Sequence, residues 1–304
     1  MDDKLARTFI KVCQEGSIRA ASTALEQEPS TVSRHVSTLE AQLAIPLLER
    51  RKTGVRPTEA GELFLAYLRR NRAEFEALIG EFDALRGLKR GKINLAVGDG
   101  FISDLLKNTL PSFQVAYPQI TFSMQSGPTE SVLQDIQNDA AHLGFVYNAG
   151  PDRTCKVIAK KAQPLELLVS PKSEWANTSS SVSIDRLAAL PMALLMPGSG
   201  IGAMVRDVEA IYGVRFNAVL EANSLATIRN FVREGLGVAI LPPFVVAGEI
   251  ADATITTIPI DVPEFSQGEA ALISRSGRRL PEAAIRLANH ASRSMNAFGH
   301  AVQS

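Results

Sequence analysis

The stretch LARTFIKVCQEGSIRAASTALEQEPSTVSRHVSTLEAQLAIPLLERRKTGVRPTEAGE (residues 5–62) decides the fold of the N-terminal part. Its apolar residues recur three or four positions apart, as on one face of a helix, in three successive sets. The first set ends at Gly16, where Ser17 is placed to cap the next helix. The third begins near Pro29, whose ring suits a first helical turn. The pattern predicts a compact module of short helices.

A small basic hairpin is predicted directly after these helices. Two short extended pieces, residues 47–51 and 55–58, flank a Lys-Thr-Gly turn. The chain as a whole carries 32 basic and 32 acidic residues, so its net charge of zero points to no polyanion. Clustering is more informative than the total, because four basic side chains fall within seven positions: Arg50, Arg51, Lys52 and Arg56.

The sequence predicts a helix, then a turn near residues 27–28, then a second helix with small polar residues at its start. This order of elements is typical of a helix-turn-helix. In that motif the start of the second helix enters the major groove, where Arg34 can pair with guanine and Glu28 can accept from cytosine N4. The alternative is that these side chains line a solvated helix face, and the basic hairpin favours the first interpretation. The candidate DNA contacts are Ser17, Glu28, Pro29, Ser30, Thr31, Ser33, Arg34, His35, Arg50, Arg51, Lys52 and Arg56.

A single long helix is predicted from about residue 58 to residue 88, where no proline occurs. At about 1.5 Å per residue it is on the order of 45 Å long. Its apolar residues follow a seven-residue repeat, which favours self-association over packing on its own domain. The expected dimerisation residues are Phe64, Leu68, Phe75, Leu78, Phe82 and Leu85.

From residue 91 onward, apolar runs alternate with helical patterns, which indicates an α/β fold with mainly parallel sheets. The expected strands lie near residues 93–98, 120–126, 143–147, 156–159, 165–170, 192–196, 218–222, 237–241 and 269–274. The expected helices lie near residues 102–116, 129–139, 201–212, 224–235 and 280–298. About 200 residues with this many strands suit two linked subdomains, with ligands at the carboxyl ends of the strands.

Composition excludes several classes of protein. No run approaches the roughly 20 apolar residues that cross a bilayer, and the first residues have no signal-peptide pattern, so we expect a cytoplasmic protein with no membrane contact. Cys13 and Cys155 lie too far apart to predict a disulfide framework or a zinc site. The four histidines have no metal-ligand spacing, and no nucleophile and base form a recognisable set. We therefore expect no enzyme, no metal and no cofactor.

The N-terminal stretch closely resembles the winged helix-turn-helix of LysR-type transcriptional regulators. Matches in order and spacing include Leu5, Phe9, Gly16-Ser17, Ala20-Ala21, Leu25, Val32-Ser33-Arg34, Leu39-Glu40, Leu43, Leu47, Arg50, Thr58 and Ala60-Gly61. Tyr117 to Ile120 and Glu234 to Pro242 extend the resemblance to the rest of the chain.

The resemblance implies an all-α winged helix-turn-helix domain, a long linker helix, and an α/β effector domain of two Rossmann-like subdomains, as in periplasmic binding proteins. The expected bounds are 1–58, 59–88 and 89–304, with one subdomain near 91–162 and 269–304 and the other near 163–268. It also implies a homodimer or homotetramer that binds double-stranded promoter DNA, answers to a small-molecule inducer and contacts RNA polymerase. The alternative is a ligand-sensing or solute-binding protein of the same α/β fold without a transcriptional role, which residues 1–88 disfavour.

Carried over by position, the implied inducer contacts are Gly100, Phe101, Ser103, Thr129, Tyr147, Ser199, Asn223 and Ser224. Hydroxyls at helix starts are more often simple caps, but their recurrence at three strand-to-helix junctions favours a ligand. A lining of hydroxyls and amides predicts a small polar ligand, with a carboxylate as the candidate group.

The sequence departs from the family pattern at three places. Glu28-Pro29 replaces the usual Ser-Gln before the second helix of the motif, so we expect a different base preference there. Ala44 stands in place of a glycine and Leu48 in place of a phenylalanine, and we expect packing to tolerate both.

Overall fold

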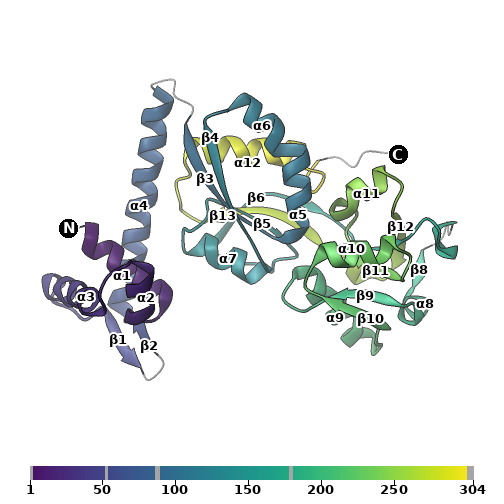
Figure 1. The fold of residues 1–304 in the computed structure, drawn as a ribbon, viewed down its shortest axis with the longest axis horizontal. Helices are drawn as coiled ribbons and strands as arrows, with labels where there is room; N and C mark the ends of the chain where they lie inside the picture. Colours follow the sequence, from purple (N-terminus) through teal and green to yellow (C-terminus); the bar gives the residue numbers. More distant parts are fainter. Residues whose placement is uncertain (1–2, 52–53, 86–89, 178–180, 300–304) are drawn as a thin grey trace. The chain divides into compact units, whose positions relative to one another are not determined.

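A computed structural model describes residues 3–51, 54–85, 90–177 and 181–299 of the chain. The chain divides into two compact units, Met1–Glu76 and Ala77–Ser304 (Figure 1). Each unit is described by itself.

Three short helices form the first unit, as the sequence predicts: α1 (Asp3–Glu15), α2 (Ile18–Ala24) and α3 (Pro29–Leu43). Ser17 caps α2, since its hydroxyl accepts from the backbone N–H of Ala20 at 3.4 Å. Pro29 occupies the first position of α3, where its missing N–H leaves no partner unsatisfied. Ala44 ends α3 in the left-handed conformation, with φ of 53°. This is the conformation that glycine adopts without cost, so the departure at Ala44 carries a strain.

The predicted hairpin consists of β1 (Leu48–Arg51) and β2 (Gly54–Pro57), which pair antiparallel. Two contacts fix it to the helices. Val55 donates its N–H to the carbonyl of Gly16 at 2.8 Å. The Glu40 carboxylate of α3 accepts from the N–H groups of Leu47 and Leu48 at 2.8 and 3.1 Å. A Cβ on Gly54, whose φ is 132°, would lie 2.2 Å from the Gly16 oxygen, so this approach requires glycine.

The long helix α4 (Glu59–Leu85) begins inside the core of the first unit. Its early residues Leu65 and Leu68 are buried in a cluster with Leu5, Phe9, Leu39 and Leu47. The Thr58 hydroxyl accepts from the N–H of Gly61 at 3.0 Å and so satisfies one free donor of its first turn.

Two mixed sheets form the second unit. The first has the order β4-β3-β5-β13-β6, built from β3 (Gly91–Val97), β4 (Ile120–Ser126), β5 (Leu143–Tyr147), β6 (Cys155–Ala162) and β13 (Glu269–Arg275). The second has the order β10-β9-β11-β7-β12-β8, built from β7 (Glu166–Val169), β8 (Val182–Ser183), β9 (Met192–Leu195), β10 (Ala218–Ala222), β11 (Val238–Leu241) and β12 (Thr256–Asp261).

Helices cover these sheets, and the central strands are therefore continuous apolar runs. On the first sheet, Ala96 and Ile273 face the cluster that includes Val132 of α7 (Thr129–Gln137), while Leu95 belongs to the cluster that includes Leu287 of α12 (Glu282–Ser294). The remaining helical segments are α5 (Asp99–Asp104), a π-helical turn (Leu105–Thr109), α6 (Leu110–Ala116), α8 (Ile184–Ala189), α9 (Gly200–Tyr212), α10 (Leu225–Arg233), α11 (Ala247–Ala251) and 3-10 turns at Glu174–Asn177, Pro243–Val246 and Pro263–Gln267.

The nine strands expected from the sequence are present, and the prediction of mainly parallel sheets is confirmed for every strand except β7 and β13, which each run against the other strands of their sheet. β13 pairs antiparallel with both β5 and β6, and β7 pairs antiparallel with both β11 and β12. The reason is that the chain passes between the sheets twice, at residues 163–165 and 262–268, and each passage sends a strand back in the opposite direction. Two strands were not expected: β8 has only two residues, and β12 contains Pro259.

Within the described residues, no helix has the length and apolarity needed to cross a membrane. The same residues contain no group of three or more His, Cys, Asp or Glu side chains that could hold a metal ion.

Replacing Ala44 with glycine should raise the free energy of unfolding of the first unit by about 1 kcal/mol, because it relieves the left-handed backbone strain. The matched control is Ala41→Gly in the last turn of α3, where the backbone is right-handed, and it should lower that free energy by up to about 1 kcal/mol. Hydrogen exchange of amides in residues 3–51 measures both. A destabilisation by both glycines would contradict the strain at Ala44.

Candidate functional site

The start of α3 presents a polar face to solvent and an apolar face to the core. Glu28, Pro29, Ser30 and Arg34 are exposed, and Thr31 and Ser33 are half-buried. On the opposite face, three apolar side chains are buried: Val32, Val36 and Leu39. The packing of the apolar face therefore determines which residues of α3 can meet another molecule.

His35 does not belong to the exposed set, and the prediction that it contacts DNA needs correction. Its side chain is 8% exposed, and Nδ1 lies 3.1 Å from the hydroxyl of Thr8 on α1. The Thr8 hydroxyl donates to the carbonyl of Lys4 at 2.9 Å, so it accepts from His35 Nδ1–H. His35 packs α3 against α1 instead of reaching outward.

The hairpin divides its basic residues between two faces. Residues 49, 51 and 56 share one face, since Glu49 lies opposite Arg56 in the ladder and Arg51 is two positions from Glu49. Arg51 donates to the Glu49 carboxylate, with Nε at 2.9 Å. Arg50 lies on the other face, opposite Val55. Arg50 and Arg56 are thus the exposed cations of the hairpin that make no ion pair among the described residues, and Lys52 lies outside those residues.

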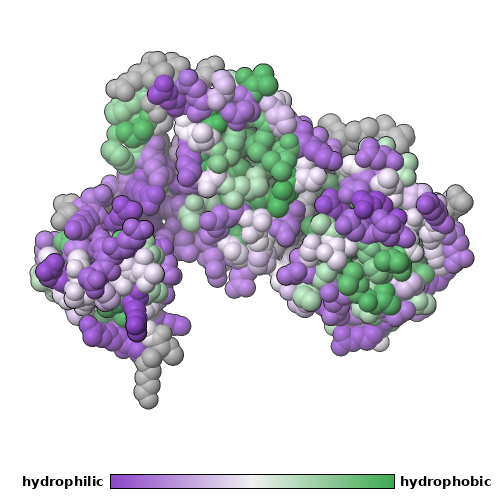
Figure 2. Space-filling model, viewed as in Figure 1, coloured by the Kyte–Doolittle hydropathy of each residue, from purple (hydrophilic) through white to green (hydrophobic). Residues whose placement is uncertain are grey.

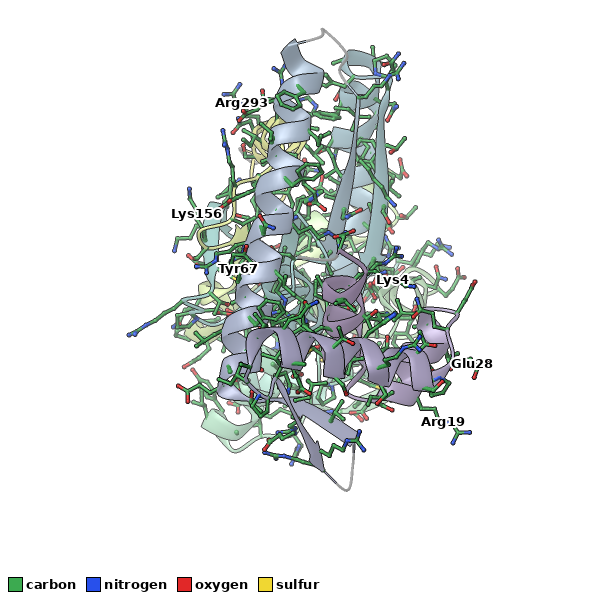
Figure 3. All side chains as sticks on the ribbon, turned by 90° about the vertical axis from the view of Figure 1, so that its left-hand side faces the viewer. Lys4, Arg19, Glu28, Tyr67, Lys156 and Arg293 are labelled. Atoms are coloured by element: carbon green, nitrogen blue, oxygen red, sulfur yellow. The ribbon has the colours of Figure 1, made fainter. Side chains whose placement is uncertain are left out.

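Arg19 is a candidate contact that the sequence analysis missed. It is exposed in the first turn of α2, two residues after the half-buried cap Ser17. Figure 3 shows Arg19 and Glu28 projecting outward on the same side of the first unit. An arginine two residues after a cap serine at the start of a helix was the available indication.

A cavity of about 350 Å³ lies in the second unit, at the carboxyl ends of strands from both sheets. It is lined by residues that follow β3, β4, β9, β10 and β11, and by Tyr147 at the end of β5. Six predicted inducer contacts line it: Gly100, Phe101, Thr129, Tyr147, Ser199 and Asn223.

Ser103 and Ser224 are not among the lining residues. Ser103 lies inside α5, and Ser224 caps α10 by accepting from the N–H of Thr227 at 3.3 Å. Ser199 serves both roles, because it lines the cavity and its hydroxyl accepts from the N–H of Gly202 at 2.9 Å. Thr129 is the first residue of α7 and makes no capping bond.

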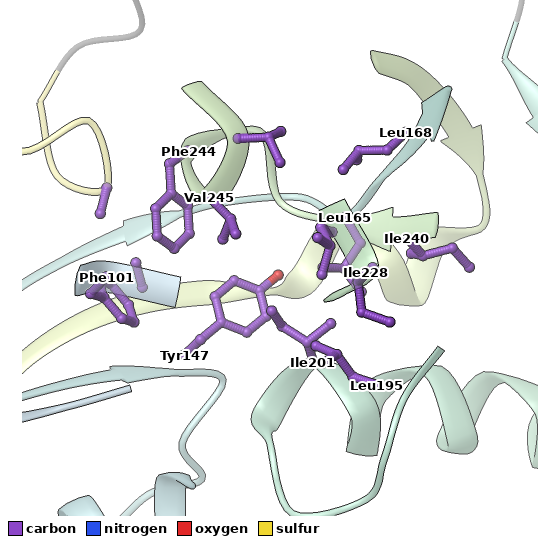
Figure 4. Close-up of a cluster of buried hydrophobic side chains, with 14 of the residues drawn as sticks. Phe101, Tyr147, Leu165, Leu168, Leu195, Ile201, Ile228, Ile240, Phe244 and Val245 are labelled. Atoms are coloured by element: carbon purple, nitrogen blue, oxygen red, sulfur yellow. The ribbon is translucent and has the colours of Figure 1, made fainter. Parts of the chain in front are cut away.

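The lining of the cavity is more apolar than the hydroxyls and amides that the sequence predicts. Phe101, Leu195, Ile201 and Phe244 form its apolar part (Figure 4). Tyr147 adds a ring, and its hydroxyl donates to the backbone carbonyl of Gln163 at 2.7 Å. Burial raises the pKa of Tyr147, so this hydroxyl stays protonated.

Asp99 is the one acidic side chain among the lining residues, and none of them is basic. Positive potential comes instead from helix starts, where α7 and α9 begin with backbone N–H groups at Thr129 and Gly200. The lining therefore combines an apolar wall with a small number of polar groups.

Neither cysteine is an activated thiol. Burial, with a smaller contribution from the charge of Glu62, raises the pKa of Cys13 to about 12. Partial burial also raises the pKa of Cys155. Both thiols are therefore protonated at neutral pH.

Two family models account for most of the chain. The bacterial regulatory helix-turn-helix protein, lysR family, matches residues 4–62, and the LysR substrate binding domain matches residues 86–296. The chain belongs to the LysR family. It is a DNA-binding transcription regulator with a ligand-binding domain, and not an enzyme. The helix-turn-helix match argues against the alternative of a solute-binding protein without a transcriptional role.

Relatives and solved structures agree with this LysR-type assignment. The chain is 25% identical over 275 residues to a probable nitrogen assimilation transcriptional activator of Synechococcus elongatus, covering 90% of this chain and 88% of that protein. A full-length OxyR variant from Pseudomonas aeruginosa has the same fold, with a TM-score of 0.70 at 20% identity, over 100% of this chain and 99% of that one. The effector-binding domain of QuiR in complex with shikimate matches 66% of this chain and 95% of its own length, with a TM-score of 0.55 at 17% identity.

The long helix α4 of this LysR-type regulator has an exposed apolar stripe that differs in part from the predicted one. Leu68 is 4% exposed inside the first unit's core, and Phe64 packs on Phe9 with ring centroids 5.5 Å apart, so neither is free for a partner. The side chain of Leu85 lies outside the described residues. The α4 stripe consists of the exposed residues Tyr67, Phe75, Leu78, Ile79 and Phe82. Figure 2 shows hydrophobic surface, in green, on the upper part of α4.

Gly200→Ala tests how closely the two sheets approach at the cavity. A Cβ at Gly200 would lie 1.9 Å from the carbonyl oxygen of Tyr147, so α9 would have to move away from β5. We expect the free energy of unfolding of the second unit to fall by about 1–3 kcal/mol. Fluorescence of Trp175, the chain's single tryptophan, reports this unfolding. Gly150→Ala is the control, because its Cβ meets nothing within 4 Å, and an equal loss there would refute the close approach.

Proposed function

We propose that the exposed start of α3 reads base edges in the major groove of promoter DNA, while the hairpin and Arg19 contact the backbone. The observation that carries this proposal is the division of α3 into a buried apolar face and an exposed polar face that holds Arg34. Arg34 supplies the fork geometry that matches guanine, and Ser30, Thr31 and Ser33 are small enough to allow close approach. Arg50 and Arg56 supply charge for phosphates.

Glu28 gives this regulator a base preference of its own. Its carboxylate is exposed directly before α3 and makes no capping bond, so it is available to accept from cytosine N4. Phosphates repel the same charge. Glu28 therefore lowers the affinity for DNA sites at which it meets no suitable base.

We propose a homodimer or homotetramer joined through the α4 stripe. An exposed row of aromatic and aliphatic side chains on a helix of 27 residues is typical of an interface between helices. Two copies would place two α3 helices on half-sites one or more helical turns apart.

We propose that the cavity holds a small organic acid with an apolar body. The apolar wall favours such a body, and the N–H groups at the starts of α7 and α9 favour one carboxylate. The lining has no basic side chain to neutralise a polyphosphate. The QuiR domain that shares this fold is in complex with shikimate, itself a carboxylate.

The remaining parts of the proposal follow from membership in this class of regulator. We propose that the protein works in the cytoplasm and contacts RNA polymerase at the promoter. We also propose the domain bounds 1–58, 59–88 and 89–304, with subdomains near 91–162 with 269–304 and near 163–268.

Arg34→Ala should weaken binding to an operator selected from random DNA by about 1–3 kcal/mol, and should weaken binding to unrelated DNA far less. Footprinting and titration at a fixed salt concentration measure both affinities. Arg72→Ala removes an exposed arginine of α4 and should leave the ratio of the two affinities unchanged. Equal losses on both DNAs after Arg34→Ala would count against base readout.

Phe75→Asp combined with Phe82→Asp should dissociate the oligomer, because two carboxylates would be buried without partners in the α4 stripe. Sedimentation velocity of the full-length protein reports the change in mass. The matched control is Ala66→Asp, which places a carboxylate on an exposed position of α4 outside the stripe. An unchanged mass in the double variant would refute the role of the stripe.

A further inference from the structure

Gln163 lies where the chain first passes from one sheet of the second unit to the other, between β6 and β7. The second passage, residues 262–268, runs beside it, since Gln163 donates its backbone N–H to the carbonyl of Gly268 at 2.8 Å. Any change in the angle between the two sheets must be accommodated at these two passages. Gln163 is itself only 8% exposed.

The carbonyl of Gln163 is connected to the cavity. It accepts the hydrogen bond from the hydroxyl of Tyr147, whose ring lines the cavity. The contact is tight, because a Cβ on Gly268 would lie 1.9 Å from the Tyr147 hydroxyl oxygen. A ligand that displaces the Tyr147 ring would therefore change its hydrogen bond to Gln163, at the passage between the sheets.

The side chain of Gln163 holds a different part of the chain, the segment after α12. Its Nε2 donates to the carbonyls of Asn296 and Ala297 at 3.2 and 3.0 Å. The N–H groups of the same two residues donate to the Asp104 carboxylate of α5 at 3.0 and 2.9 Å. The backbone of Asn296 and Ala297 is thus held between Gln163 and Asp104.

The segment also reaches the cavity wall on its other side. Phe298 stacks on Phe101, with ring centroids 6.3 Å apart and planes 18° apart, and Phe101 lines the cavity. Phe101 lies on the same short helix as Asp104. Two lining residues, Tyr147 and Phe101, are therefore joined through Gln163 and the segment Asn296–Phe298.

We propose that Gln163 is a positioning residue for the effector response: it ties the angle between the two sheets to Tyr147 on one side and to the segment Asn296–Phe298 on the other. A ligand that moves Tyr147 or Phe101 then alters the bonds that hold this segment and the passage together. The regulatory meaning of this coupling rests on the proposal that the cavity is the effector site, whereas the coupling itself does not.

Amide hydrogen exchange of Asn296 and Ala297 in the full-length protein, without ligand or DNA, tests the coupling. Gln163→Met removes both side-chain bonds and should speed exchange of these amides at least tenfold. Tyr147→Phe removes one oxygen atom at the cavity and should speed exchange at the same remote amides at least threefold. In the double variant the exchange should match that of Gln163→Met alone, because the effect of Tyr147 passes through Gln163.

A purely structural role for Gln163 would give a different pattern. The proposal would be overturned if Tyr147→Phe left the exchange rates of Asn296 and Ala297 unchanged. It would also be overturned if the acceleration in the double variant equalled the product of the accelerations in the two single variants. Tyr147→Phe retains the ring, so it decides the matter even if the Gln163 variant does not fold. Gln137→Met is the matched control, since it also removes a side-chain amide, which donates to Asp152 at 2.8 Å, and should leave both amides unchanged. Equal acceleration by this control would show general destabilisation and would also overturn the proposal.

The effector proposal is tested separately, by whether shikimate or benzoate raises the unfolding temperature of the full-length wild-type protein while inorganic phosphate does not. Failure of the carboxylates would refute the ligand class but leave the exchange results standing. Failure of the exchange test would leave carboxylate binding intact.

Discussion

The two passages of the chain between its sheets are the constraint on which the second unit depends. Because the chain leaves the first sheet after β6 and returns only at β13, each sheet contains a strand that runs against its neighbours. The parallel strands of both sheets then end at one common edge, where backbone amides and small residues gather. The cavity, its apolar wall and the bonds around Gln163 are consequences of this single arrangement.

In the first unit the corresponding constraint is the burial of one face of α3. Val32, Val36 and Leu39 fill small clusters with α1 and α2, and this fixes the rotation of α3 about its own axis. Glu40 then fixes the hairpin through two backbone N–H groups. A short helix would have little stability alone, so its polar face is specified by what the apolar face touches.

The sequence predicted the elements well because their cause is local. Caps such as Ser17, the proline at the start of α3 and the apolar periodicity all act within a few residues. Residues whose environment depends on distant contacts were not predictable: His35 meets Thr8 of another helix, and Leu68 completes a core formed by residues 5–47. At the cavity, glycines and hydroxyls after strands were found from their positions. Phe244 and Asp99 line the same cavity without any local motif that indicates it.

A ligand controls DNA binding only if it has different affinities for two arrangements of the protein. An apolar pocket of fixed shape would bind a ligand equally before and after any change elsewhere, and would transmit nothing. The cavity here is lined from both sheets, so its shape changes with the angle between them. Gly200 allows the start of α9, which follows the second sheet, to approach the backbone carbonyl of Tyr147 at the end of β5 in the first sheet. The binding free energy of a ligand that contacts both sheets can therefore favour one angle between them over another. In the proposed coupling, that angle depends on the hydrogen bonds of Gln163 at the passage between the sheets as well as on the contacts in the cavity.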